Sequence, residues 1–136
     1  MRVDLAIECW NRLEQAARLW RETGLANGGI LADTYHMNIE ERSLPEAIRA
    51  AGPLVKHIHL SDSNRAAPGL GHVDFAAVLQ ALLDIDYPGY LAFELDHRAA
   101  MRSGLVPSER REDPTPYLME QGIEHLKRLE SEFEVV

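Results

Sequence analysis

The sequence predicts an α/β fold with parallel strands, and two observations carry this prediction. A short run rich in β-forming residues is followed by an amphipathic helix four times along the 136 residues. Each of these runs also has an ionisable residue at its last or next-to-last position. Strands that alternate with helices are joined by right-handed crossovers and therefore lie parallel. No linker or low-complexity tract interrupts the alternation, so we expect a single domain over residues 1–136.

The first two units have clear boundaries. The four predicted strands are residues 3–8, 29–33, 55–60 and 90–95. After the first strand, apolar residues recur at positions 13, 16, 17 and 20, and Gly24 is placed to end that helix. After the second strand, Ser43 and Glu46 form a capping box, and Gly52 with Pro53 ends the helix.

The last two helices are also marked by their ends. Asp74 is the expected N-cap of a helix whose apolar stripe comprises residues 75, 78, 79 and 82. The final helix starts at Asp113 and Pro114 and runs through Phe133, with Gly122 as a weak point inside it. Residues 97–112, which precede this helix, are expected to form a long loop.

The ionisable residues at the four strand ends are candidate metal ligands. They are Glu8, Asp33, His59 and Glu94. Ligands of parallel sheets bind beyond the carboxyl ends of the strands, where a buried charge is costly unless it is paired or bound to a metal. Three carboxylates and one imidazole suit Mn²⁺, Mg²⁺ or Co²⁺ better than a structural Zn²⁺. Each of these residues alone can instead face water at a strand end, and His59 can be a core histidine satisfied by hydrogen bonds. Their equivalent positions in the four units nevertheless favour a metal site.

Three strings of the sequence resemble the xylose isomerase-like TIM barrels, and within them the ketose 3-epimerases that act on D-tagatose and D-psicose. The strings are DTYHMNIEE at 33–41, HIHLSDSNRAAPGLGHVDF at 57–75 and GYLAFEL at 89–95. The resemblance implies four consecutive βα units of a TIM (β/α)8 barrel, namely its C-terminal half. A complete barrel takes about 250 residues, so half of the barrel wall is expected to be absent.

The resemblance also implies the roles of individual residues. In that family a divalent ion, usually Mn²⁺, is held by residues matching Glu8, Asp33, His59 and Glu94, with Mg²⁺, Co²⁺ or Zn²⁺ as further possibilities. Glu8 and Glu94 are implied to be the catalytic acid/base pair. Three further positions match substrate-binding residues of the family, and these are Glu14, His36 and Arg65.

The implied reaction is epimerisation, or aldose–ketose isomerisation, of a sugar or sugar phosphate. A metal would stabilise the enediolate that forms when a proton leaves the carbon next to a ketose carbonyl, and Glu8 and Glu94 would exchange that proton on opposite faces.

Simpler roles stay open for three residues and one loop. Glu14 can be favoured by the helix dipole, His36 can be a loop residue, and Arg65 can pair with Asp62. The Gly-rich segment 68–74 lacks a P-loop pattern, and we interpret it as a turn that lets backbone approach the substrate.

Composition argues against several other functions. The net charge of −8 and the pI near 5.2 argue against nucleic acid and membrane surfaces as partners, and against an endonuclease IV-like nuclease, which shares the fold. The single cysteine, Cys9, excludes an intrachain disulfide framework and fits a reducing cytosol. No apolar run predicts a membrane span or signal peptide, so we expect a cytoplasmic protein.

An isolated half-barrel is expected to need a partner, because it exposes two sheet edges and an apolar sheet face. One hypothesis is a homodimer, or higher homo-oligomer, in which two copies close a barrel with C2 symmetry. A second is a fragment that needs a separately supplied N-terminal half. A third is an open sheet that has lost catalysis, leaving a non-catalytic sugar- or metal-binding module.

Overall fold

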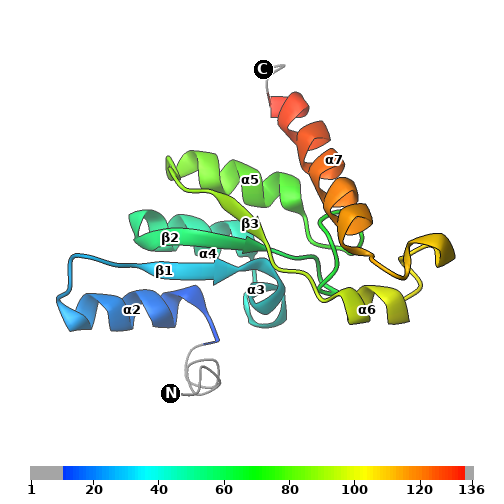
Figure 1. Cartoon of the computed structure of the whole chain (residues 1–136). Coiled ribbons are helices and arrows are strands. Elements are labelled where there is room, and N and C mark those ends of the chain that lie inside the picture. Colours follow the sequence, from blue (N-terminus) through cyan, green and yellow to red (C-terminus); the bar gives the residue numbers. More distant parts are fainter. Residues whose placement is uncertain (1–10, 134–136) are drawn as a thin grey trace.

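The structure, a computed structural model, describes residues 11–133 and contains a parallel three-stranded sheet. The strands are β1 (Ile30–Asp33), β2 (Val55–Leu60) and β3 (Leu91–Phe93), in the order β1-β2-β3. All three arrows point the same way in Figure 1. The predicted α/β class with parallel strands is therefore confirmed, whereas the predicted first strand, residues 3–8, lies outside the described residues.

Four helices follow the predicted pattern. They are α2 (Leu13–Thr23), α4 (Leu44–Ala51), α5 (Phe75–Asp84) and α7 (Thr115–Phe133). Gly24 ends α2 with a left-handed φ of 67°, which favours glycine, and the Ser43 hydroxyl caps α4 at the Glu46 amide. Helix α4 packs between α2 and α5. None of the helices in this part of the chain is long and apolar enough to cross a membrane.

Two short helices correct the sequence prediction. Helix α3 (Thr34–Glu40) follows β1 directly, and α6 (His97–Arg102) lies inside the segment expected to be a loop. The 3-10 helices η1 (Gly52–Leu54) and η2 (Ser108–Arg110) complete the fold. With seven and six residues, α3 and α6 are too short for a clear apolar period, and their N-caps, Asp33 and Asp96, determine where they begin. Both lie near the carboxyl ends of the strands (Figure 1).

The sheet has one face packed on helices and one face that carries ionisable groups. Ile58 and Leu60 of β2 are completely buried, and they belong to one apolar cluster with Ile48 of α4 and Phe75 of α5. Burying such a side chain stabilises the fold by about 1.5–3 kcal/mol. On the opposite face, Leu31 is 50% exposed. The strands therefore alternate as predicted.

Gly122 proves to be a contact point and not a weak point of α7. The helix runs unbroken through this residue, which is buried. A Cβ at position 122 would lie only 2.8 Å from two ring atoms of Phe93 in β3 and 3.2 Å from Cδ of Pro68. The absence of a side chain therefore lets α7 approach the last strand closely.

The loop after β2 wraps around a buried carboxylate. Asp62 has no exposed surface, and its oxygens accept hydrogen bonds from the amides of Ser63 (2.7 Å), Gly69 (2.9 Å) and Val73 (3.0 Å). The Gly-rich segment expected to approach a substrate thus has two of its amides directed at the chain's own carboxylate. These three hydrogen bonds fix the conformation of the loop that carries Arg65.

Replacing Asp62 with alanine is expected to destabilise the protein strongly. The variant leaves three amides around a fully buried position without their acceptor, so the free energy of unfolding should fall by about 2 kcal/mol or more. The matched control is Asp74→Ala, which removes one exposed capping bond, to Ala77, and should cost about 1 kcal/mol. Urea unfolding of both variants measures the difference, and equal losses would contradict the interpretation.

Candidate metal centre

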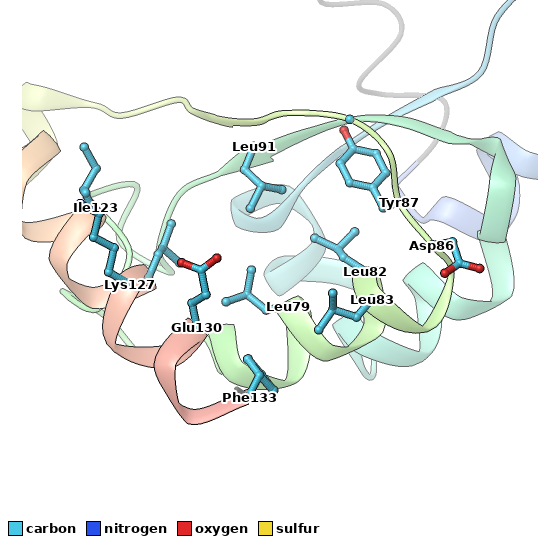
Figure 2. A pocket seen from close by; sticks show the side chains of 12 residues that line it. Leu79, Leu82, Leu83, Asp86, Tyr87, Leu91, Ile123, Lys127, Glu130 and Phe133 are labelled. Atoms are coloured by element: carbon cyan, nitrogen blue, oxygen red, sulfur yellow. The ribbon is translucent and has the colours of Figure 1, made fainter. Parts of the chain in front are cut away.

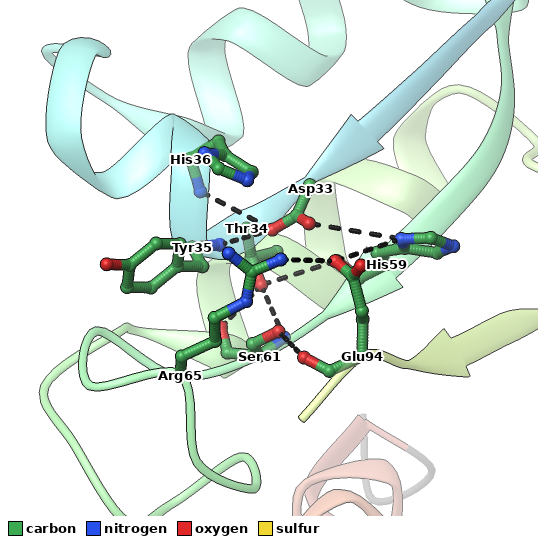
Figure 3. Close-up of polar contacts among 8 residues, drawn as sticks. All are labelled: Asp33, Thr34, Tyr35, His36, His59, Ser61, Arg65 and Glu94. Atoms are coloured by element: carbon green, nitrogen blue, oxygen red, sulfur yellow. Dashed lines mark hydrogen bonds and ion pairs between the residues drawn. The ribbon is translucent and has the colours of Figure 1, made fainter. Parts of the chain in front are cut away.

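The register of the parallel strands brings three predicted ligands to one point. Asp33 is paired with His59, and His59 is paired with Ala92 on the other side. Glu94 follows Ala92 by two residues and so points to the same face. Ligand atoms of Asp33, His59 and Glu94 all lie within 4.8 Å of one another, and Figure 3 shows the three side chains converging.

The three side chains differ in exposure. The Asp33 side chain is 8% exposed, His59 25% and Glu94 43%. Nδ1 of His59 lies 3.9 Å from Oδ2 of Asp33 and 3.4 Å from Oε2 of Glu94. The site is therefore closed at Asp33 and open at Glu94, which leaves Glu94 accessible to a ligand in the cavity.

The two carboxylates influence each other's ionisation. Burial, and then the hydrogen bond with Glu94, raise the pKa of Asp33 above its ordinary value. The same hydrogen bond, together with the nearby charges of Arg65 and His59, lowers the pKa of Glu94. The surroundings therefore favour the protonated form of Asp33 and the ionised form of Glu94.

This donor set fits a divalent metal ion. Two carboxylates and one imidazole are ligands that Mn²⁺, Mg²⁺, Co²⁺ and Zn²⁺ all accept, and a divalent cation would neutralise the charge that the clustered carboxylates bring together. Asp33 is already oriented for this role, because its Oδ1 caps α3 through the amide of Tyr35 at 2.9 Å. The helix thereby fixes one oxygen and leaves the other facing His59.

Arg65 and His36 also lie at this site. Nη2 of Arg65 is 2.9 Å from Oε2 of Glu94, and its guanidinium lies 5.0 Å from the ring centre of Tyr35. The side chain of Arg65 is thus directed at Glu94; only its backbone amide bonds to Asp62, at the carbonyl oxygen. His36 lies in the first turn of α3 and lines the cavity, so it is not a loop residue.

Two other predicted residues are not brought into this cluster. Glu14 is exposed in the first turn of α2, a position that the helix dipole favours, and it does not line the cavity beside the cluster. Glu8 lies outside the described residues, so its assignment as a ligand and catalytic residue stays a prediction. His57 packs edge-on against His59, with ring centres 5.0 Å apart.

A cavity of about 590 Å³ opens in front of the cluster. Asp33, His36, His59, Arg65 and Glu94 line one side of it. Side chains of α2 and α3 contribute apolar surface, including Leu13, Ala16, Met37 and Ile39. A small polar ligand bound here would meet the charged groups on one side and apolar surface on the other.

A second hollow lies away from the strand ends. It is an apolar groove of about 420 Å³ between α5, α7 and β3, with Leu79, Leu83, Leu91 and Ile123 in its wall (Figure 2). Its charged residues, Asp86, Lys127 and Glu130, do not form a metal-competent group among the residues described. The cavity at the strand ends is therefore the candidate functional site.

Sequence reasoning missed three residues that surround the candidate metal ligands. Tyr35 supports Arg65, and Thr34 and Ser61 form hydrogen bonds behind the ligands (Figure 3). The only sequence feature that could have indicated them is their closeness to the predicted ligands. Thr34 and Tyr35 follow Asp33 directly, and Ser61 comes two residues after His59.

The fold and the site together define a class of protein. Parallel strands followed by helices, with ionisable groups gathered beyond the strands' carboxyl ends, are the arrangement of α/β barrel proteins that bind ligands at one face of the barrel. The profile of the xylose isomerase-like TIM barrel family matches residues 1–129, and the chain belongs to this family.

Its relatives include sugar epimerases. The chain is 38% identical over 116 residues to D-psicose 3-epimerase of Enterocloster bolteae, an alignment that covers 84% of this chain and 38% of that protein. It is 39% identical over 100 residues to D-psicose 3-epimerase of Agrobacterium fabrum, covering 68% and 35%. The crystal structure of D-allulose 3-epimerase from Methylomonas sp. aligns with a TM-score of 0.71 at 28% identity, covering 89% of this chain and 44% of that one. The chain thus spans less than half the length of these proteins.

Metal affinity is expected to rise with pH. The pKa of Asp33 is raised, so in acidic solution a proton competes with the metal for this carboxylate, and affinity should increase by up to about tenfold per pH unit while that proton is displaced. Titration calorimetry with Mn²⁺ at pH values from the ordinary carboxyl range, about pH 4, upward measures the slope. The control Asp33→Asn should bind weakly at every pH. An affinity for the wild-type chain that does not change with pH would contradict the assignment.

Proposed function

We propose that this chain carries the metal-binding half of a sugar epimerase or isomerase active site. The observation that supports this most strongly is the convergence of Asp33, His59 and Glu94 at the end of a parallel sheet. The similarity to proteins named D-psicose 3-epimerase supports a ketose as the substrate class. Glu8, at the end of the first predicted strand, is proposed as a fourth ligand, and Mn²⁺ as the metal.

The proposed reaction moves a proton at the carbon next to a ketose carbonyl. The bound cation would supply positive charge where negative charge develops on the substrate oxygens. Glu94 suits the proton transfer, because Asp33 and Arg65 favour its ionised form, and because it lies at the open side of the site and lines the cavity. We assign Glu8 as its partner on the opposite face of the sugar, so that removal and return of the proton invert the stereocentre.

Arg65 and His36 are proposed to bind the substrate. Arg65 is held between Glu94 and the ring of Tyr35, so its remaining N–H groups can donate to sugar oxygens or to a phosphate. His36 lines the same cavity from α3. Glu14 is proposed only as a peripheral contact, since it is exposed on α2.

The proposal predicts metal-dependent hydrogen exchange in a ketose. With Mn²⁺ in D₂O, the chain should incorporate deuterium next to the carbonyl of D-fructose or D-psicose, as followed by NMR. Glu94→Gln should lower the exchange rate by about 10²-fold or more, because the base is lost. The matched control is Glu120→Gln on the exposed surface of α7, which should leave the rate unchanged.

Two results would separate the alternatives. Exchange that persists in Glu94→Gln would exclude Glu94 as the base. Mn²⁺ binding without exchange in any ketose tested would instead favour a non-catalytic sugar- or metal-binding module.

Self-association is a further part of the proposal. Strand β3 lies at one edge of the described sheet; its first residue, Leu91, is 37% exposed, and Tyr90 just before it is 89% exposed. We propose that a second copy covers such surfaces in a homodimer or higher homo-oligomer. Analytical ultracentrifugation should then give at least twice the mass of one chain, and a well-folded monomer at all concentrations would overturn this.

A further inference from the structure

Two buried hydroxyl groups lie directly behind the metal ligands. Thr34 follows Asp33, Ser61 lies two residues after His59, and both have no exposed surface. Neither can reach a ligand in the cavity. Their hydrogen bonds therefore act within the protein, and Figure 3 shows them joining the ends of the three strands.

Thr34 joins the ends of β1 and β2. Its Oγ1 donates to the carbonyl of Ser61 at 2.6 Å, accepts from the Ser61 amide at 2.9 Å and lies 3.4 Å from the carbonyl of His59. Strand β1 ends at Asp33, where the chain turns into α3, so its backbone can no longer pair with β2. The Thr34 hydroxyl takes over this pairing one residue beyond the strand.

Ser61 joins the ends of β2 and β3 in the same way. Its hydroxyl donates to the backbone carbonyl of Glu94, and the Glu94 amide donates to the carbonyl of Leu60 at 3.2 Å. Strand β3 ends at Phe93, so these contacts hold Glu94 just beyond the regular ladder. The backbone of each carboxylate ligand is thus tied to the strand that carries His59.

From this arrangement we infer that Thr34 and Ser61 are positioning residues, which set the spacing of Asp33 and Glu94 about His59 and thereby the affinity of the site for a divalent cation. The inference rests on the proposed metal site. Apolar side chains of similar size would fill the same space, so packing alone does not require hydroxyl groups here. Groups that orient metal ligands typically change metal affinity by about 10–100-fold when they are removed.

The experiment compares Mn²⁺ affinity in paired variants of the full chain, measured by calorimetry at fixed pH and well below the melting temperature. Thr34→Val removes the hydroxyl and keeps the shape, and should weaken binding by about tenfold or more. Thr34→Ser keeps the hydroxyl and should restore most of the affinity. Ser61→Ala should also weaken binding, because it removes the hydrogen bond to the backbone carbonyl of Glu94. If Thr34→Val does not fold, Ser61→Ala alone tests the inference.

A stability control separates positioning from general loosening of the fold. Val78→Ala removes buried methyl groups from α5, a helix that supplies none of the residues lining the cavity, and should lower the melting temperature yet leave Mn²⁺ affinity unchanged. If Val78→Ala weakens binding as much as Thr34→Val does, the hydroxyl groups act only through stability, and the inference is wrong.

The outcomes also distinguish this inference from the proposed function. If the wild-type chain binds Mn²⁺ and Thr34→Val and Ser61→Ala bind it equally well, only the positioning role is overturned. If the wild-type chain binds no divalent cation at all, the metal site is wrong and the positioning role falls with it. Weakened binding in both variants, with rescue by Thr34→Ser, supports both.

Discussion

The alignment of three parallel strand ends is the constraint on which the rest of the structure depends. Because the strand register places Asp33, His59 and Glu94 next to one another at the carboxyl ends of the strands, two carboxylates and an imidazole lie close together. Like charges at this separation repel each other, and partial burial of Asp33 adds a desolvation cost. The surrounding structure offsets this cost with groups that each have an identifiable local origin.

Three of these groups act on different ligands. The amides at the start of α3 bond Asp33, Arg65 donates to Glu94, and the Thr34 hydroxyl fixes the strand ends. Arg65 itself adopts a φ of 58°, an uncommon conformation for a residue with a side chain, and the loop that contains it is held by the buried Asp62. Asp62 lines neither of the two cavities described above, and it thereby supports Arg65, which lines the cavity at the strand ends.

Much of the fold could be predicted from the sequence because it follows from local patterns. The apolar stripes predicted α2, α4, α5 and α7, and β-rich runs predicted β1, β2 and β3. The short helices α3 and α6 were missed, since a helix of one or two turns shows no period and depends on its capping residue. Gly122 was misinterpreted for a related reason: its role comes from Phe93, which lies 29 positions earlier in the chain.

Some features of the candidate site could likewise be predicted from the sequence, and others could not. The sequence by itself determined which residue types stand at the strand ends, because strand alternation and the parallel class are local properties. It thus predicted Asp33, His59 and Glu94 as a group with Glu8, which lies outside the described residues. Only the tertiary structure decided that Arg65 pairs with Glu94 and not with Asp62, that Glu14 stays at the surface, and that Thr34 and Ser61 tie the ligands together. These outcomes depend on strand register and on the path of the loops, which are set by packing between segments far apart in the chain.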